Sequence, residues 1–387
     1  MSYYLLPCMN NEINPENIKL KFSKDKEKEI FINHNLYKYL TDEKRRINNY
    51  SSEWENMKKY KNPYEFIHTS LPFQKKSISK YKPLSRAFFK MIEICNTFNL
   101  LQYYRGTIRS FHLAEGPGGF IEALQYLRNN NEDIYFGMTL IDSTNTNVPG
   151  WRKIHNFLNS HKNVILEYGK DKRGDLYNPE NFLYCIEKYK NSMDIITGDG
   201  GFDFSINYDE QEAQVLKLIF CQIAYAIALQ KKGGTFILKI FDVFLQSSVE
   251  LIYILSCLYK KVHIIKPNTS RYANSEKYIV CEQYILEDSS SITKKLHSIL
   301  VVLNNMKTDT YRISSFINFS MQSIYLDKLK EINCILGQQQ IETITSTLNL
   351  IEQTKTTFSP LVKEKNIQKC IHWCQKNNIP YFKNIYI

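Results

Sequence analysis

The sequence lacks the features that define several large classes of protein. Its nine cysteines form no CxxC pair, and the apolar patch at the start of the chain has no basic segment before it, so we expect neither a disulfide scaffold nor a secretory signal. Uninterrupted apolar runs stay below the roughly 18 residues that a membrane-spanning helix needs. We therefore expect a protein of a reducing compartment, cytoplasmic or nuclear, with no place in a membrane.

Residues that bind metals in recognisable patterns are also scarce. The nearest approach to a ligand set is Cys370-Ile-His372-Trp-Cys374. A second pair of ligands at zinc-finger spacing is missing from the sequence. We expect no structural metal, and we interpret these thiols as reduced.

Acidic residues are outnumbered by basic ones. Over 387 residues, 39 Asp and Glu stand against 50 Lys and Arg, which leaves a formal net charge of +11. Such a surplus favours a polyanionic partner, nucleic acid before an anionic membrane surface. The hydrophobic share of 43% is that of a globular protein, and it excludes a disordered chain, a collagen-like repeat and a coiled-coil rod.

Three segments of the chain differ in character. Residues 1–80 are rich in lysine and show no clear strand pattern, with short helical stretches around 41–60; this basic extension is a candidate for contacts with RNA or its cap. Residues 81–290 alternate between strand-like and helical patterns. Residues 291–387 have a helical period and predict an α-helical C-terminal extension.

The middle segment predicts an α/β fold with a mostly parallel sheet. Apolar runs alternate with helical stretches, and each helix supplies the crossover that two parallel strands need. The last two runs have no helix between them and predict an antiparallel hairpin. The seven runs are 110–114, 134–141, 163–167, 193–197, 235–241, 262–265 and 277–281. Together they predict the Rossmann-like, seven-stranded sheet of an S-adenosylmethionine-dependent methyltransferase.

A glycine-rich turn follows the first of these runs. Residues 115–120 read Glu-Gly-Pro-Gly-Gly-Phe and lie between a strand and a helix. Glycines allow close approach of a ligand to the backbone, and the start of the helix offers free N–H groups to a carboxylate or phosphate. The spacing is neither that of a dinucleotide fingerprint nor that of a P-loop. A plain tight turn between strand and helix explains the motif equally well.

Four charged residues lie in or next to apolar strands and an amphipathic helix. Asp199 ends a buried strand before two glycines, Lys239 interrupts the apolar run 235–241, Glu276 precedes the last strand, and Lys90 lies in an amphipathic helix. Ligands of open α/β sheets bind at the carboxyl ends of the strands. Each residue also has an ordinary explanation, namely a turn cap, an outward-facing lysine, a solvated acid and a surface lysine.

The order of the motifs resembles that of a known family. SRAFFK, AEGPGGF, DGGF, FILKIF and SRYANSE follow one another as in the FtsJ-like (RrmJ-type) 2′-O-ribose methyltransferases. The resemblance covers roughly residues 54–285 and is strongest to the cap-specific mRNA 2′-O-methyltransferases of eukaryotes and large DNA viruses. Abundant Asn, Ile, Lys and Tyr fit AT-rich coding DNA; for a viral protein, the virion or cytoplasmic replication sites are the expected locations.

The resemblance implies a role for each motif. The family's catalytic tetrad falls on Lys90, Asp199, Lys239 and Glu276. The residues expected to bind S-adenosylmethionine are Ser85, Ala114, Glu115, Gly116, Pro117, Gly118, Gly119, Phe120, Asp142, Asp175, Leu176 and Asp199. The residues expected to bind RNA are Arg86, Lys90, Ser270, Arg271, Asn274 and Glu276. Around Asp142 the sequence MTLIDSTNTN leaves the usual ribose-binding carboxylate ambiguous.

The implied reaction is methylation of the ribose 2′-OH of a cap-proximal nucleotide in mRNA, of the cap 1 type. Lys239 is then the general base or the group that orients the hydroxyl, Lys90 positions the hydroxyl and a nearby phosphate, and the two acids hold the lysines. Capped mRNA is the expected partner, with other capping or transcription proteins as further candidates. Two alternatives stay open: 2′-O-methylation of ribosomal or transfer RNA, and a non-catalytic RNA-binding subunit with a methyltransferase fold.

Overall fold

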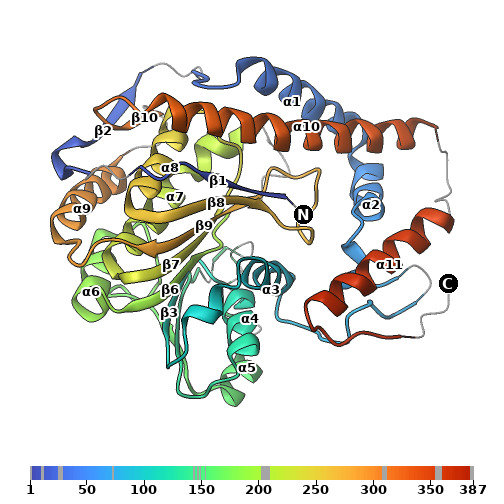
Figure 1. Cartoon of the computed structure of the whole chain (residues 1–387), viewed down its shortest axis with the longest axis horizontal. Coiled ribbons are helices and arrows are strands. Elements are labelled where there is room, and N and C mark those ends of the chain that lie inside the picture. The colour runs from blue at the N-terminus through green and yellow to red at the C-terminus, as the bar shows by residue number, and fades with distance from the viewer. Residues whose placement is uncertain are drawn as a thin grey trace.

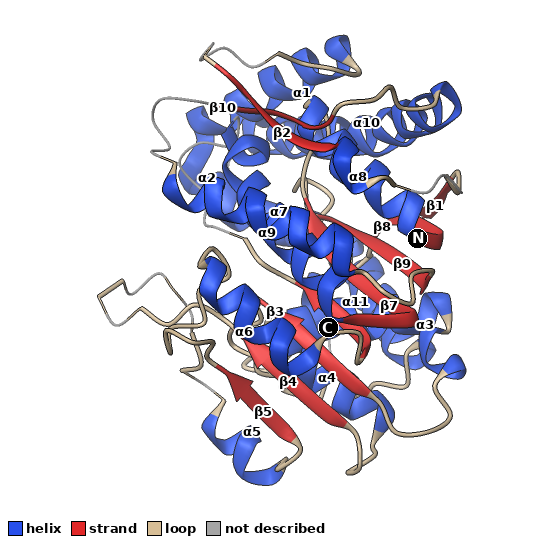
Figure 2. Ribbon diagram, turned by 90° about the vertical axis from the view of Figure 1, so that its left-hand side faces the viewer, coloured by secondary structure: helices blue, strands red, loops and turns tan. Residues whose placement is uncertain are grey.

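A central sheet with helices on both faces organises the molecule (Figures 1 and 2). The computed structural model describes residues 2–9, 13–24, 29–71, 74–142, 144–145, 148, 150–152, 154–201, 210–306, 312–353 and 360–383. The strands are β1 (Ser2–Leu6), β2 (Ile18–Ser23), β3 (Arg109–Leu113), β4 (Ile134–Met138), β5 (Val164–Glu167), β6 (Met193–Gly198), β7 (Gln230–Ile240), β8 (Tyr259–Lys266), β9 (Lys277–Tyr284) and β10 (Arg312–Ile317).

Some of the helices cover the two faces of the central sheet, and others pack outside it. The helices are α1 (His34–Arg46), α2 (Ser51–Lys61), α3 (Ala87–Phe98), α4 (Gly119–Arg128), α5 (His155–Ser160), α6 (Pro179–Tyr189), α7 (Gln211–Leu229), α8 (Gln246–Leu258), α9 (Ser290–Asn305), α10 (Ser323–Gln353) and α11 (Pro360–Lys376). Short 3-10 turns add Pro15–Asn17, Ile47–Tyr50, Glu65–Ile67 and Leu100–Tyr103.

The sheet has the order β1-β8-β9-β7-β6-β3-β4-β5. β3, β4, β5, β6 and β7 pair in parallel, whereas β9 lies antiparallel between β7 and β8. This confirms the mostly parallel seven-stranded sheet with an antiparallel hairpin at its end. β1 pairs antiparallel with β8 and adds an eighth strand at that edge.

The two faces of the sheet pack into separate hydrophobic clusters. Successive strand residues point to opposite faces, so Phe236 and Leu238 of β7 pack with α7 and α8, whereas Ile237 packs with α3 and α4. Lys239 therefore shares the α3 side with Ile237. The same alternation places Tyr278 of β9 on that side, opposite Lys239 in the register of the two strands.

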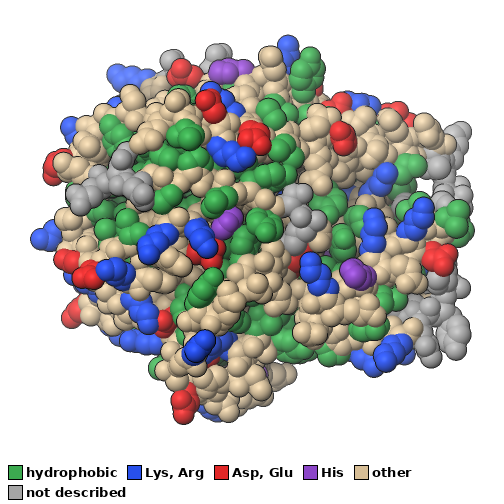
Figure 3. Space-filling view, viewed as in Figure 1, with side chains coloured by type: hydrophobic (Ala, Val, Ile, Leu, Met, Phe, Trp, Pro, Cys, Tyr) green, Lys and Arg blue, Asp and Glu red, His purple; other side chains and the backbone are tan. Residues whose placement is uncertain are grey.

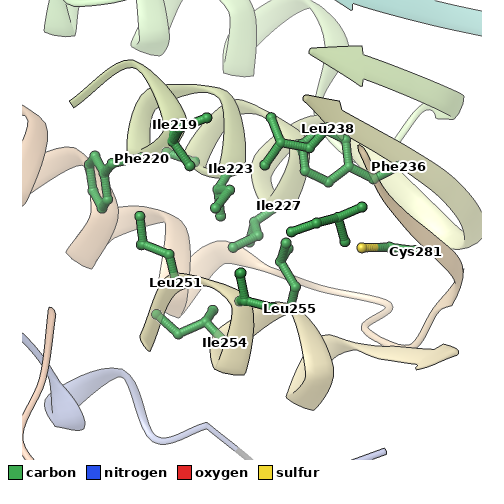
Figure 4. Close-up of a cluster of buried hydrophobic side chains, with 14 of the residues drawn as sticks. Ile219, Phe220, Ile223, Ile227, Phe236, Leu238, Leu251, Ile254, Leu255 and Cys281 are labelled. Atoms are coloured by element: carbon green, nitrogen blue, oxygen red, sulfur yellow. The ribbon is translucent and has the colours of Figure 1, made fainter. Parts of the chain in front are cut away.

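A cluster of buried apolar side chains lies between α7, α8 and the strands beneath them (Figure 4). Side chains of α7 and α8 point toward each other and toward the strands beneath them, and Ile227 and Leu255 are fully buried there. Among the described residues, α7 is long and apolar enough to cross a membrane by length and composition alone, which the count of uninterrupted apolar residues did not indicate. Most of it is buried inside this cluster, as expected of a core helix.

The segments outside the central sheet pack against one another and against its helices. α1 runs alongside α10 and α2 contacts it at an angle (Figure 1), and both share a cluster of buried side chains with Phe244, which follows β7. The sequence of residues 1–80 shows no clear strand pattern, but two strands, β1 and β2, form there. The α-helical C-terminal extension is confirmed by α9, α10 and α11, and it also contains one strand, β10, which pairs with β2. The strands that the sequence did not indicate have few buried apolar residues, and their partners lie far away in the sequence.

Truncating a side chain between α7 and α8 should destabilise the whole fold. We expect Ile227→Ala to lower the free energy of unfolding by about 2–5 kcal/mol, because it removes buried apolar volume and leaves a cavity. Urea denaturation followed by circular dichroism measures the change. Ile324→Ala in α10 is the matched control, since Ile324 is 61% exposed; equal losses in the two variants would contradict this account of the core.

Candidate active site

Four elements bring the polar residues of the sequence motifs to one edge of the sheet. Asp199 directly follows β6, Lys239 lies one residue before the end of β7, Glu276 directly precedes β9, and Lys90 lies in the first turns of α3. Because β9 runs antiparallel to β7, its first residue pairs with the last residue of β7. The start of one strand and the end of the other therefore meet at the carboxyl edge of the parallel strands, where open α/β sheets bind ligands.

The four side chains form two ion pairs. Lys90 Nζ lies 2.6 Å from Glu276 Oε1, and Lys239 Nζ lies 3.3 Å from Asp199 Oδ1. Lys239 also donates a hydrogen bond of 2.6 Å to the Asp199 carbonyl oxygen. The structure thus brings together all four residues of the expected tetrad.

Burial and charge act in opposite directions on this cluster. Burial lowers the pKa of Lys90, and the carboxylate of Glu276 partly opposes that change. Burial alone would raise the pKa of Glu276, but the ammonium groups of Lys90 and Lys239 bring it well below its usual range. Glu276 is therefore ionised, paired with Lys90 and further stabilised by the charge of Lys239.

Tyr278 belongs to the same cluster, although sequence reasoning did not single it out. Its hydroxyl donates a hydrogen bond of 2.9 Å to Asp199 Oδ1, and its ring centre lies 5.9 Å from Lys90 Nζ. Tyr278 is fully buried, and burial raises the pKa of its hydroxyl well above the usual value. The available signal was its position two residues after Glu276, on the same face of the strand as the tetrad.

The glycine-rich turn is organised by Glu115. Its Oε1 atom accepts hydrogen bonds from the backbone N–H groups of Phe120 (2.7 Å) and Ile121 (3.1 Å). The expectation of free N–H groups at this helix start is therefore wrong for these two residues. Glu115 Oε2 is buried and has no hydrogen-bond partner among the described residues. Burial raises the pKa of Glu115 to about 8.

Close backbone contacts shape the rest of this turn. Gly118 has φ of +115°, a conformation that side chains disfavour. A Cβ atom on Gly119 would lie 2.2 Å from Ser85 Oγ, and one on Gly116 would lie 2.5 Å from the Gly150 carbonyl oxygen. Ser85 thus lies against the turn. Ala114 is close to Gly200, which follows Asp199, so the turn borders the tetrad.

The remaining donor-site candidates lie in two neighbouring loops. Asp142 Oδ1 accepts hydrogen bonds from the backbone N–H and the hydroxyl of Thr144, so it caps its own loop. Asp175 Oδ1 accepts a hydrogen bond from the Tyr177 N–H (2.9 Å), and the Leu176 side chain packs in the core. A backbone hydrogen bond from Ile141 to the Arg173 carbonyl joins these loops. Phe202 of the DGGF motif lies outside the described residues.

The candidates for RNA contact differ in how they are engaged. The Ser270 hydroxyl donates to Glu276 Oε1 at 2.7 Å. Arg271 forms a bidentate pair with Glu65 (3.0 and 2.6 Å), which holds its guanidinium in a mostly buried ion pair. The Asn274 carbonyl accepts a hydrogen bond from Lys266 Nζ. Arg86 is half-buried, and its charge lowers the pKa values of Lys90 and Glu276, which places it beside the tetrad.

The cysteines near the C-terminus behave as core residues. Cys370 and Cys374 are buried, and the Cys370 thiol donates to the Pro63 carbonyl oxygen at 3.4 Å. Burial raises the pKa of Cys374 to about 12, which keeps the thiol protonated. Within the described ranges, no group of three or more His, Cys, Asp and Glu side chains is placed to hold a metal ion.

Comparison with known proteins identifies the relatives of this chain. A family model described as FtsJ-like methyltransferase matches residues 83–284. Cap-specific mRNA (nucleoside-2′-O-)-methyltransferase 2 of Danio rerio is 32% identical over 277 residues, 69% of this chain and 36% of the relative. The corresponding protein of Pongo abelii is 29% identical over 69% of this chain and 35% of its own length.

Two further matches differ in coverage. Cap-specific mRNA (nucleoside-2′-O-)-methyltransferase 1 of Dictyostelium discoideum is 29% identical over 81% of this chain and 42% of its own length. This chain therefore spans about a third to two fifths of these curated relatives. A solved structure provisionally described as a ribosomal RNA methyltransferase from Plasmodium falciparum is 21% identical, covers 52% of this chain and 98% of its own, and has a TM-score of 0.38.

The raised pKa of Glu115 predicts how stability depends on pH. Between pH 4.5 and 8 the carboxyl group ionises in the unfolded chain but stays protonated in the folded protein, so it reduces stability as the pH rises through this window, by at most about 1.4 kcal/mol per pH unit. We expect Glu115→Gln, which cannot ionise, to gain stability relative to the wild type across this range. Thermal unfolding at pH 5 and pH 8 measures the effect.

Exposed Glu132 provides the matched control for this prediction. Glu132→Gln should show the same pH dependence as the wild type. A Glu115→Gln variant whose stability ran parallel to the wild type from pH 5 to pH 8 would show that Glu115 is ionised in the folded protein.

Proposed function

Because the chain belongs to the FtsJ-like methyltransferase family, we propose that it methylates the ribose 2′-OH of a cap-proximal nucleotide in mRNA. The methyl donor is S-adenosylmethionine, the donor that family membership implies. One observation carries the proposal: Lys90, Asp199, Lys239 and Glu276 meet at the carboxyl edge of the sheet, beside the glycine-rich turn.

The glycine-rich turn suits a methyl donor of this size. Gly118 has a backbone conformation that L side chains disfavour. Gly116 and Gly119 let the turn pack directly against the Gly150 carbonyl oxygen and Ser85 Oγ, which fixes the shape of the turn next to the tetrad. Ser85, Ala114 to Phe120 and the loops around Asp142 and Asp175 would hold the donor. When bound, S-adenosylmethionine supplies an electrophilic methyl group on a sulfonium.

The lysines supply what the acceptor hydroxyl needs. In an in-line displacement, the bond from the ribose oxygen to the methyl carbon forms as the carbon–sulfur bond breaks, and the hydroxyl proton must leave. Lys239 orients the hydroxyl or, once its own ammonium has released a proton, accepts the hydroxyl proton, while Asp199 and the Asp199 carbonyl fix the position of Nζ. Lys90 positions the hydroxyl and a neighbouring phosphate, held by Glu276.

The proposed substrate is capped mRNA. The relatives are named cap-specific mRNA methyltransferases, and the net charge of +11 suits a polyanionic partner. Other capping or transcription proteins are further candidate partners. The buried thiols suit a reducing, intracellular location, cytoplasmic or nuclear.

Removing the Lys239 amine should abolish methyl transfer but preserve donor binding. We expect Lys239→Ala to lower the transfer rate by at least about 10²–10⁴-fold, with the Kd for S-adenosylmethionine nearly unchanged in calorimetry. Transfer is measured with a radiolabelled methyl group on short capped RNA. Lys232→Ala on the exposed part of the same strand is the control and should keep full activity; near-normal turnover by Lys239→Ala would refute the role of Lys239.

The cap requirement separates this function from methylation of ribosomal or transfer RNA. We expect an RNA with a 5′ cap to be methylated at a ribose next to the cap, and the same RNA without a cap to be methylated poorly. Nuclease mapping of the labelled nucleotide gives the position. Equal methylation of capped and uncapped transcripts would contradict the cap-specific function.

A further inference from the structure

A buried polar cluster lies where α1 and α10 meet the central sheet. Lys44 Nζ of α1 lies 2.6 Å from Asp242 Oδ2 and donates a hydrogen bond of 3.0 Å to Ser275 Oγ. The Ser275 hydroxyl also donates to Asp242 Oδ2 at 2.9 Å. Lys277 Nζ lies 3.6 Å from the other Asp242 oxygen. Lys44 and Ser275 are 7% and 6% exposed, so most of the cluster is shielded from bulk water.

This cluster joins the two chain segments that carry half of the tetrad. Asp242 follows Lys239 by three residues, and Ser275 directly precedes Glu276. A shift of either segment by a fraction of an ångström would move Lys239 or Glu276 relative to the other. The ammonium group of Lys44, which belongs to α1, contacts both segments, through Asp242 in one and Ser275 in the other.

Further contacts hold the same turn in place. Gln340 of α10 donates hydrogen bonds to the Ala273 carbonyl oxygen (3.0 Å) and to Ser275 Oγ (3.4 Å). From the other side, buried Lys266 donates to the Glu276 carbonyl oxygen at 2.6 Å. Residues 273–276 are thus held by two segments, α1 and α10, that lie outside the family match of residues 83–284.

A buried ion pair adds little net stability to an interface, because removing its two charges from water offsets much of their attraction. Apolar residues of similar volume often stabilise a protein as well or better, because they avoid the cost of removing charges from water. The neighbouring contacts of α1 and α10 are of that apolar kind, including Leu40, Ile344 and Leu348. Stability alone therefore does not explain the charged side chain of Lys44. Its two partners, Asp242 and Ser275, lie close in sequence to Lys239 and Glu276.

We propose that Lys44 is a positioning residue for the methyl transfer, which fixes Lys239 and Glu276 relative to each other through Asp242 and Ser275. The proposal rests on the function proposed above, because it assigns Lys44 a role in that reaction. It also makes α1 a part of the working enzyme, although α1 lies before the matched methyltransferase segment. Displacements of about 1 Å at a distance from the reacting atoms can lower a rate about 10²-fold.

The test compares three variants of the full chain on capped RNA. Lys44→Met removes the bridge but keeps most of the side-chain volume. Ser275→Ala removes one hydroxyl and keeps the Lys44–Asp242 ion pair. Leu40→Ala weakens the α1–α10 interface one helical turn from Lys44 without touching the bridge. For each variant, kcat, the KM for RNA, the Kd for S-adenosylmethionine and the melting temperature are measured.

A positioning role predicts a split between rate and binding. We expect kcat to fall at least tenfold in Lys44→Met and at least fivefold in Ser275→Ala, with KM and Kd within twofold of the wild type. Leu40→Ala should lower the melting temperature and keep kcat within twofold. If Lys44→Met fails to fold, Ser275→Ala still decides, since it changes one buried hydroxyl.

The outcomes separate this proposal from the function on which it depends. An active wild type with unchanged kcat in Ser275→Ala, or a Leu40→Ala variant that loses as much kcat as Lys44→Met, would overturn the positioning role alone. A folded wild type that transfers no methyl group to capped RNA would overturn the proposed function, and the role of Lys44 with it.

Discussion

The structure depends on holding two functional lysines, Lys90 and Lys239, inside a protein core. Lys90 and Lys239 lie between apolar neighbours, within residues 88–92 of a helix and 236–240 of a strand, and burial of an unpaired ammonium is unfavourable. Glu276 and Asp199 offset that cost, but only at hydrogen-bond distance and from fixed positions. The antiparallel insertion of β9 beside β7 provides those positions, since it places the start of one strand against the end of the other.

The same constraint explains why so much chain surrounds the sheet edge. Glu276 lies at the end of a turn, and turns are mobile unless their backbone groups are bonded. Glu93 accepts hydrogen bonds from the N–H groups of Asn268 and Thr269, Glu65 holds Arg271, and Lys266 binds the turn from below. Two acids from distant parts of the sequence and one nearby lysine thus restrain one short segment.

The sequence predicted most of the central sheet and little of what surrounds it. Runs such as 193–197 and 235–241 are apolar enough to be read as buried strands, because both of their faces are covered. β2 has a single buried residue, Ile18, and pairs with β10 almost 300 positions later, so no local pattern could reveal it.

The tetrad was found through the order of its motifs. Tyr278 was indistinguishable from a core aromatic, and the pairing of Arg271 with Glu65 depends on a long-range contact. The surplus of lysines was a poor guide, since on the face in Figure 3 Lys and Arg side chains are scattered among acidic and apolar ones.

β1 covers the β8 edge of the sheet, so the complete sheet includes a segment that lies before the family match. A strand edge without a partner exposes a row of N–H and C=O groups that can pair with another molecule. Five residues at the N-terminus, Ser2–Leu6, cover β8 from Val262 to Lys266. A fragment cut at residue 83, where the family match begins, would keep every tetrad residue and the glycine-rich turn, yet leave this edge bare. The segment that contains the tetrad is therefore shorter than the segment that pairs β8 on both sides.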